Sequence, residues 1–178
     1  MSKSSVTDVL VLGLQGAGKS LLVRRLMRLA KTGNPSLPLD CDVVATVGVE
    51  LQSIAGKKRG SAITSREVGG AMLPVWTQYL QDCKVLMYVI DVSDPVVLAS
   101  AAMELFVLLS AAQLKDRPIL VVLNKTDCAD VMQRTEVDMS LQLREMPPHV
   151  KSRLSVLETS ALEGTNTPEV LQWIRAHT

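Results

Sequence analysis

The chain has 178 residues, of which 47% are hydrophobic and 21% charged, and its formal net charge is +1. This length and apolar content predict one compact domain over residues 1–178, and the near-neutral charge gives no indication of a nucleic-acid partner. No apolar run reaches the ~18 residues of a membrane span, and the first residues lack the apolar core of a signal peptide.

Apolar, strand-like runs alternate with helical patterns along the chain, which is typical of an α/β fold with helices on both faces of a mostly parallel sheet. A strand is predicted at residues 6–12, and a helix begins at Lys19. The apolar residues of this helix recur at helical spacing, and its basic residues are expected to form a solvated face: Arg24, Arg25, Arg28 and Lys31.

The rest of the chain contains one predicted hairpin followed by alternating strands and helices. The hairpin strands are expected at residues 47–54 and 61–68, and they supply the one antiparallel pair at the edge of a six-stranded sheet. In order, strands follow at residues 85–90, 119–123 and 154–159, and helices at residues 95–113 and 133–145 and from Thr167 onward.

The sequence GLQGAGKS at residues 13–20 lies between the first predicted strand and helix. It matches the phosphate-binding pattern G-x-x-x-x-G-K-S/T in the strand-then-helix context that the pattern requires, which disfavours a simple glycine-rich turn. In such a loop, backbone N–H groups and the helix N-terminus surround the phosphates. The expected binding residues are Gln15, Gly16, Ala17, Gly18, Lys19 and Ser20, with the Ser20 hydroxyl on Mg²⁺.

The sequence NKTD at residues 124–127 comes directly after the predicted strand at residues 119–123. Asp127 can accept both N–H donors on the edge of guanine, whereas adenine lacks that pair and would leave a buried charge unpaired. Alone, NKTD is an ordinary polar turn. Together with the phosphate loop it predicts guanine recognition, to which the backbone of TSAL at residues 159–162 can donate.

Two further segments adjoin the hairpin strands, ATVG at residues 45–48 and EVGG at residues 67–70. These are the places where a switch protein senses the γ-phosphate. The five motifs in this order resemble those of the small GTPases over nearly the whole chain. The G-L-x-x-x-G-K loop, the T-x-G segment and a V-G-G turn followed by Pro74, Trp76 and Tyr79 are similar to the Arf-like branch.

The resemblance implies a small-GTPase P-loop fold that binds GTP or GDP with Mg²⁺. Ser20 and Thr46 would coordinate Mg²⁺, Thr46 only in the GTP form, and Glu67 would contact it through water, although the family usually has aspartate there. Gly70 would donate its N–H to the γ-phosphate. The base-recognition positions of the family are matched by Asn124, Lys125, Asp127, Ser160 and Ala161, and Leu162 follows them.

The chain departs from the family at the residue that orients the attacking water, because Ala71 stands in place of the usual glutamine. We therefore expect hydrolysis that is slow or that depends on a GTPase-activating protein, with Gln15 a weaker candidate for placing water. Two other functions stay open: a pseudo-GTPase scaffold that holds its nucleotide permanently, and a P-loop nucleotide kinase.

The partner-binding positions of the family correspond to Val49, Arg66 and Tyr79, of which only the tyrosine is retained. We therefore expect a different set of effectors, while Trp76 is expected to pack in the core. Ser2 in place of glycine excludes N-myristoylation, and no C-terminal prenylation cysteine is present, so we expect no lipid anchor of its own. We also expect a monomer.

The cysteines Cys41, Cys83 and Cys128 are odd in number and widely spaced. This argues against a disulfide framework and a zinc site, and it favours a reducing compartment. We therefore expect a cytoplasmic protein, and the resemblance suggests intracellular or ciliary trafficking with recruitment to the Golgi or cilium by partners.

Overall fold

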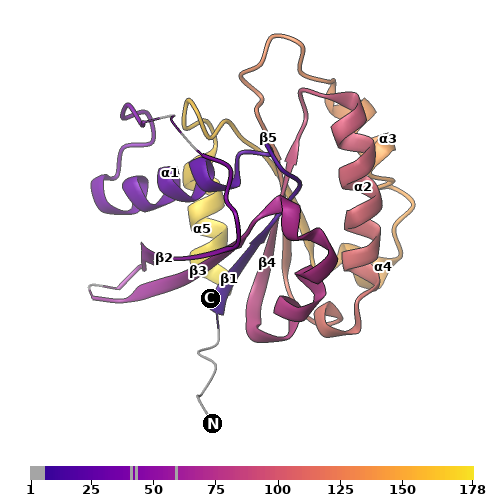
Figure 1. Cartoon of the computed structure of the whole chain (residues 1–178), viewed down its shortest axis with the longest axis horizontal. Helices are drawn as coiled ribbons and strands as arrows, with labels where there is room; N and C mark the ends of the chain where they lie inside the picture. The colour runs from indigo at the N-terminus through magenta and orange to yellow at the C-terminus, as the bar shows by residue number, and fades with distance from the viewer. Residues whose placement is uncertain (1–6, 41, 43, 59) are drawn as a thin grey trace.

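The computed structural model describes residues 7–40, 42, 44–58 and 60–178. The predictions about Ser2, about Val6 as a strand residue and about Cys41 lie outside these residues. The described strands form one six-stranded sheet in the order β2-β3-β1-β4-β5-β6, with helices on both faces (Figure 1). No helix in the described ranges is long and apolar enough to cross a membrane.

The predicted sheet is confirmed, including its one antiparallel pair at the edge. The strands are β1 (Thr7–Leu12), β2 (Val49–Ala55), β3 (Ala62–Val68), β4 (Cys83–Asp91), β5 (Ile119–Asn124) and β6 (Leu154–Glu158). Strand β2 runs antiparallel to β3, and the other neighbouring pairs are parallel. The central strands are continuous apolar runs because helices cover them on both sides.

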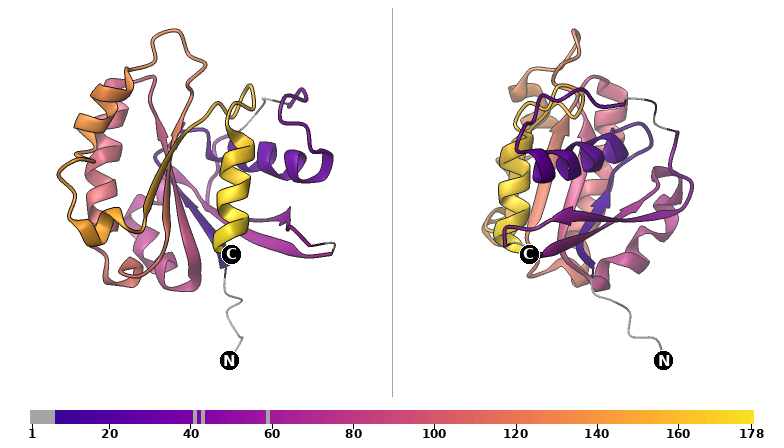
Figure 2. Two further views of the ribbon diagram at one scale, coloured as in Figure 1. Left: turned by 180° about the vertical axis from the view of Figure 1, so that it is seen from behind. Right: turned by 90° about the vertical axis from the view of Figure 1, so that its left-hand side faces the viewer.

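The helices divide into two layers, which Figure 2 shows from two sides. They are α1 (Lys19–Thr32), α2 (Pro95–Ser110), α3 (Arg134–Ser140), α4 (Pro148–Lys151) and α5 (Thr167–His177), with 3-10 helices η1 (Gly70–Asp82) and η2 (Ala112–Leu114). Val9 and Val11 of β1 face the layer of α1 and α5, whereas Leu10 and Leu12 face that of η1 and α2. This alternation follows from the two-residue period of a strand.

Two predicted helices end earlier in the structure, and one helical element was not predicted. The helix expected at residues 133–145 ends at Ser140, because Gln142 adopts a left-handed φ of 49° and Pro147 and Pro148 follow. Leu141, which lies beyond the end of this helix, is still buried, and the apolar pattern therefore predicted a longer helix than the structure contains. Helix α2 ends at residue 110 instead of 113, and η1 was not predicted because it contains Pro74 and lacks a regular apolar period.

Trp76 packs in the core, as predicted, and fastens η1 to the sheet. Its indole Nε1 donates to the carbonyl oxygen of Gly69 at 3.2 Å. Its ring meets that of Tyr88 edge-on at 6.2 Å between centroids, and the Tyr88 hydroxyl donates to the carbonyl of Ala101. Trp76 therefore positions the turn that leads from β3 into η1, and this turn adjoins Gly70, the glycine predicted to contact the γ-phosphate.

Replacing Trp76 by alanine is expected to lower the free energy of unfolding by about 3–5 kcal/mol, because a large buried side chain leaves a cavity. Urea denaturation measures this change. Met103→Ala is the matched control, since Met103 is 69% exposed and its loss is expected to cost less than about 0.5 kcal/mol. Equal losses in the two variants would contradict a core role for Trp76.

Candidate functional site

The loop between β1 and α1 surrounds the buried ammonium of Lys19. Lys19 Nζ donates to the carbonyl oxygens of Gly13 at 2.9 Å and Leu14 at 3.0 Å, so the side chain folds back over the loop. Burial lowers the pKa of Lys19, and the nearby charge of Glu67 opposes this shift. A positive charge held at the mouth of a loop at a helix N-terminus is suited to binding phosphate.

A cavity of about 310 Å³ brings together the three segments that were predicted to contact phosphate and Mg²⁺. Gly70 touches the phosphate loop directly, because a Cβ atom on Gly70 would lie 2.2 Å from the backbone nitrogen of Gln15. Ala71, which follows it, is exposed. The cavity is lined by Gln15, Gly16, Gly18, Lys19, Ser20, Leu21, Val44, Ala45, Thr46, Glu67 and Gly70.

Three oxygen-bearing side chains converge at the inner end of this cavity. Ser20 Oγ donates to Glu67 Oε1 at 2.6 Å, Thr46 Oγ1 donates to the same atom at 3.2 Å, and the two hydroxyl oxygens lie 3.0 Å apart. Glu67 is buried, and its Oε2 has no hydrogen-bond partner within the described part of the chain. Burial raises the pKa of Glu67, against the hydrogen bond from Ser20 and the charge of Lys19.

This donor set fits Mg²⁺. Hydroxyl and carboxylate oxygens are the ligands that this cation prefers, and it often retains several waters. The buried Oε2 of Glu67 has no partner among the described residues, and a cation or a metal-bound water would satisfy it. Ser20 and Thr46 would bind the ion directly. Glu67 would contact it through a water or orient the hydroxyls of Ser20 and Thr46 toward it.

The predicted base-recognition residues lie at the carboxyl end of β5. Asn124 is fully buried: its Nδ2 donates to the carbonyl of Ala17 at 2.8 Å, and its Oδ1 accepts from the backbone N–H of Ala161 at 3.0 Å. The amide of Asn124 thus ties the phosphate loop to the loop after β6. Among the described residues, no group donates to the carboxylate of Asp127, which leaves it available as an acceptor.

Lys125 pairs with a carboxylate that the sequence reasoning did not single out. Its Nζ lies 2.6 Å from Asp91 Oδ2, at the end of the neighbouring strand β4. Burial would raise the pKa of Asp91, but hydrogen bonds from Lys125 and Ser93 outweigh burial, and the net shift is downward. The position of Asp91 directly after an apolar strand was the available signal, since carboxyl ends of neighbouring parallel strands meet at one edge.

Three of the four backbone N–H groups of TSAL are used internally, beginning with that of Thr159, which donates to the carbonyl of Leu123. The N–H of Ser160 donates to the carbonyl of Thr165, and the N–H of Ala161 donates to Asn124. The N–H of Leu162 has no partner within the ranges that the structure describes. Contact of Ser160, Ala161 and Leu162 with guanine therefore stays a prediction, and of the three only Leu162 has an N–H that is not already used within the described ranges.

The prediction of a solvated Arg25 is wrong, because its side chain is buried and 2% exposed. Arg25 lies three residues after Leu22 and four before Leu29, which places all three on one face of α1. The helical spacing was therefore the signal that the interpretation of a basic face overlooked. Arg24 and Lys31, in contrast, are exposed as expected.

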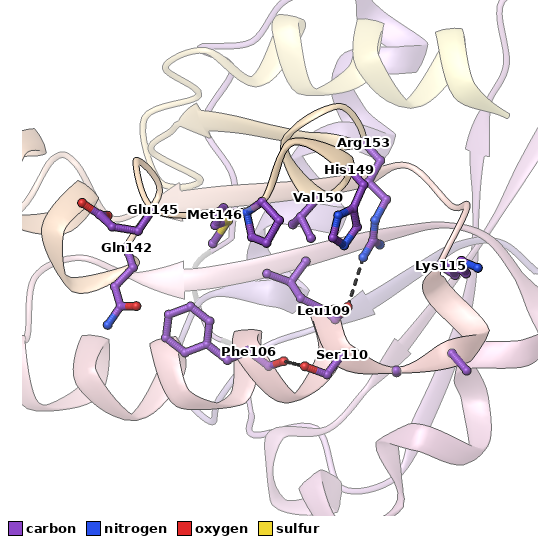
Figure 3. A pocket seen from close by; sticks show the side chains of 13 residues that line it. Phe106, Leu109, Ser110, Lys115, Gln142, Glu145, Met146, His149, Val150 and Arg153 are labelled. Carbon is purple, nitrogen blue, oxygen red and sulfur yellow. Dashed lines mark hydrogen bonds between the residues drawn. The ribbon is translucent and has the colours of Figure 1, made fainter.

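A second cavity, of about 500 Å³, lies between the C-terminal half of α2 and the segment around α4 (Figure 3). Its walls are mainly apolar, with Phe106, Leu109, Met146 and Val150 among them. Arg153 at its edge donates to the carbonyls of Leu109 and Leu114 and so ties the end of α2 to β6. It contains none of the predicted site residues, so the smaller cavity with the charged groups is the candidate site.

Replacing Glu67 by glutamine keeps the shape of the side chain but removes its charge from the oxygen cluster. Loss of such an outer contact typically weakens metal binding about 10- to 100-fold, so we expect the Mg²⁺ concentration that retards GDP release to rise by that factor. Titration of Mg²⁺ in a GDP-release assay measures it.

Glu169→Gln is the matched control, because Glu169 is exposed on α5 and does not line the cavity that contains Glu67. This control is expected to keep the wild-type Mg²⁺ dependence. An unchanged Mg²⁺ dependence in Glu67→Gln would remove Glu67 from the metal site.

Comparison with known proteins agrees with this geometry. Residues 1–178 match the ADP-ribosylation factor family. Human ADP-ribosylation factor-like protein 16 is 36% identical over 168 residues, which cover 94% of this chain and 84% of the human protein. ADP-ribosylation factor-like protein 1 of Saccharomyces cerevisiae is 29% identical over 93% of this chain and 84% of that protein.

Among solved structures, the Arl6 BBS3 small GTPase from Trypanosoma brucei, determined with the nucleotide analogue GppNp, has the same fold. Its TM-score is 0.75 at 20% sequence identity, and the match covers 96% of this chain and 95% of that one. The family match over the full sequence and the identity to the human relative show that this chain belongs to the ADP-ribosylation factor family of small GTPases.

Proposed function

We propose that this small GTPase binds GTP or GDP with Mg²⁺, recruits effector proteins in its GTP form and hydrolyses GTP slowly without a partner protein. The observation that carries the proposal is the convergence of Ser20, Thr46 and Glu67 beside the phosphate loop. Thr46 reaches this cluster from a long loop, so its position can depend on what the cavity contains.

Each part of the nucleotide has a matching group in the proposed complex. Lys19 and the loop backbone hold the outer phosphates, and Gly70, which packs against the phosphate loop, donates its N–H to the γ-phosphate. Mg²⁺, when bound, supplies positive charge that neutralises the phosphates. Asp127 accepts hydrogen bonds from the guanine edge. Asn124 holds the phosphate loop and the loop after β6 at a fixed relative position.

Slow hydrolysis is inferred from Ala71. Its methyl group is exposed at the start of η1, next to Gly70, and has no polar atom with which to orient water. Loss of one preorganised donor typically costs about 10²- to 10³-fold in rate. Gln15 contributes the one side-chain amide to the described cavity lining, which supports it as a weaker water-positioning candidate.

The effector surface is proposed at the loop that contains Thr46 and along the adjoining strand β2. Val44, Val47 and Leu51 are 87%, 95% and 64% exposed, and Val49 adjoins them. Beside them, the guanidinium of Arg66 lies 5.9 Å from the centre of the Tyr79 ring. An exposed apolar cluster beside a cation and an aromatic ring is suited to a protein partner.

A trafficking role, in the cell interior or the cilium, rests on family resemblance alone. The absence of a water-orienting glutamine also favours a second candidate, a pseudo-GTPase scaffold that keeps its nucleotide. The two differ in whether bound GDP exchanges and whether Thr46 changes position between the GDP and GTP forms. A nucleotide kinase does not fit the family assignment.

Guanine selectivity is expected to depend on the Asp127 carboxylate. Asp127→Asn replaces one of the two acceptor oxygens of the carboxylate by an amide donor, so affinity for GDP is expected to fall at least about 100-fold while affinity for xanthosine diphosphate rises. Competition binding against fluorescent GDP measures both affinities. Asp130→Asn, an exposed change in the same loop, is expected to bind like the wild type. Retained guanine preference in Asp127→Asn would contradict the base site.

Restoring a glutamine at position 71 is expected to speed single-turnover GTP hydrolysis by about 10²-fold with little change in nucleotide affinity. Gln15→Ala on the wild-type background is expected to reduce the residual rate only if Gln15 places the water. Radiolabelled phosphate release measures both. If the wild type already hydrolyses GTP as fast as Ala71→Gln, slow intrinsic turnover is wrong.

A further inference from the structure

The buried side chain of Arg25 connects the two loops that border the proposed nucleotide site at its base end and its switch end. We propose that Arg25 is a positioning residue that couples the loop at residues 159–166 to the loop at residues 33–46. This inference rests on the proposed function, in which the first loop contacts guanine and the second ends at Thr46.

The guanidinium of Arg25 donates to two backbone carbonyls of each loop. Toward the loop after β6, its Nε donates to Ala161 at 3.0 Å and its Nη2 donates to Leu162. Toward the loop after α1, its Nη1 donates to Pro35 at 2.9 Å and to Leu37. The guanidinium is planar and its donors diverge in fixed directions, so it can hold two loops at one relative position.

The peptide groups of Ala161 are fixed from both sides by two buried side chains. Asn124 Oδ1 accepts from the N–H of Ala161, and Arg25 Nε donates to its carbonyl oxygen. The peptide between Ala161 and Leu162 contains that carbonyl together with the N–H of Leu162, which is the available donor of this loop. Arg25 therefore holds the orientation of the peptide that carries the Leu162 N–H.

The two loops also touch each other directly. A Cβ atom on Gly164 would lie 2.1 Å from the carbonyl oxygen of Pro35, so the backbones meet without room for a side chain. Gly164 has a φ of 89°, which most other residues disfavour. The loops lie side by side next to α1 and α5 in both Figure 1 and Figure 2. Ordering one loop therefore restricts the other.

The chain of contacts runs from the base to the switch. Guanine that orders residues 160–162 also orders Arg25, and Arg25 holds Pro35 and Leu37 at the start of the loop that leads to Thr46. Asn124 links the same base loop to the phosphate loop through Ala17. Arg25 is therefore the side chain that couples base binding to Pro35 and Leu37, at the start of the loop that leads to Thr46.

Arg25→Lys and Arg25→Gln test the coupling in the full chain, with Lys31→Gln as the control for a cation on the exposed part of α1. Lysine keeps the buried charge but cannot span both loops. GDP release is expected to become on the order of tenfold faster in both Arg25 variants, because hydrogen bonds from a charged group are lost. Fluorescence of a labelled GDP measures the rate.

A structural defect elsewhere would not change the relative affinity for nucleotides that differ only at the carbonyl oxygen of the base. GDP is therefore compared with 6-thio-GDP, in which sulfur, a weaker acceptor, replaces that oxygen. The wild type and Lys31→Gln are expected to prefer GDP, and both Arg25 variants are expected to lose most of this preference. Hydrogen exchange is expected to rise at residues 33–40 and 159–166 together, and to stay unchanged at residues 119–124.

Wild-type GDP release in a cooperatively folded Arg25 variant, or faster exchange in only one of the two loops, would overturn the coupling. If Arg25→Gln does not fold, GDP release and hydrogen exchange in Arg25→Lys test the coupling. If the wild type binds no GDP, the proposed function has failed, and hydrogen exchange on nucleotide-free protein still tests whether Arg25 joins the loops.

Discussion

The nucleotide site depends on one buried amide, that of Asn124, which satisfies a donor and an acceptor on two different loops. A side chain that could only donate or only accept hydrogen bonds could not do this, because the carbonyl of Ala17 needs a donor and the N–H of Ala161 needs an acceptor. Both groups are buried, so losing the amide would leave each unsatisfied. Arg25 extends this arrangement to a third loop through the carbonyl of the same residue, Ala161.

Charge burial explains the phosphate end of the site. Burial lowers the pKa of Lys19 and raises that of Glu67, so both groups are held where their charged forms are costly. A phosphate beside Lys19 and a divalent cation beside Glu67 would stabilise both charged forms. Burying these two charges without ligands therefore lowers the stability of the fold. The loop that contains Thr46 contacts this part of the site through the oxygen cluster of Ser20, Thr46 and Glu67.

Much of the fold was predictable from the sequence because its signals are local. Central strands such as β5 are short apolar runs covered on both sides, and the phosphate loop lies where its glycines and Lys19 indicated. The end of α3 was not predictable, since Leu141 and Leu143 continue an apolar pattern through residues that leave the helix. Glycine and proline mark where a helix can end, but tertiary packing decides which apolar residues beyond it stay buried.

By itself, the sequence predicted the chemistry of the proposed site: a loop for phosphates, Asp127 as an acceptor and hydroxyls for a cation, with Ala71 lacking a polar group. Only the tertiary structure decided how these groups act together. Arg25 and Ala161 are 136 residues apart in the chain, and their contact exists because α1 and the loop after β6 pack against each other. A periodic pattern can place Arg25 on the buried face of a helix, but it carries no information about which carbonyls that face will meet.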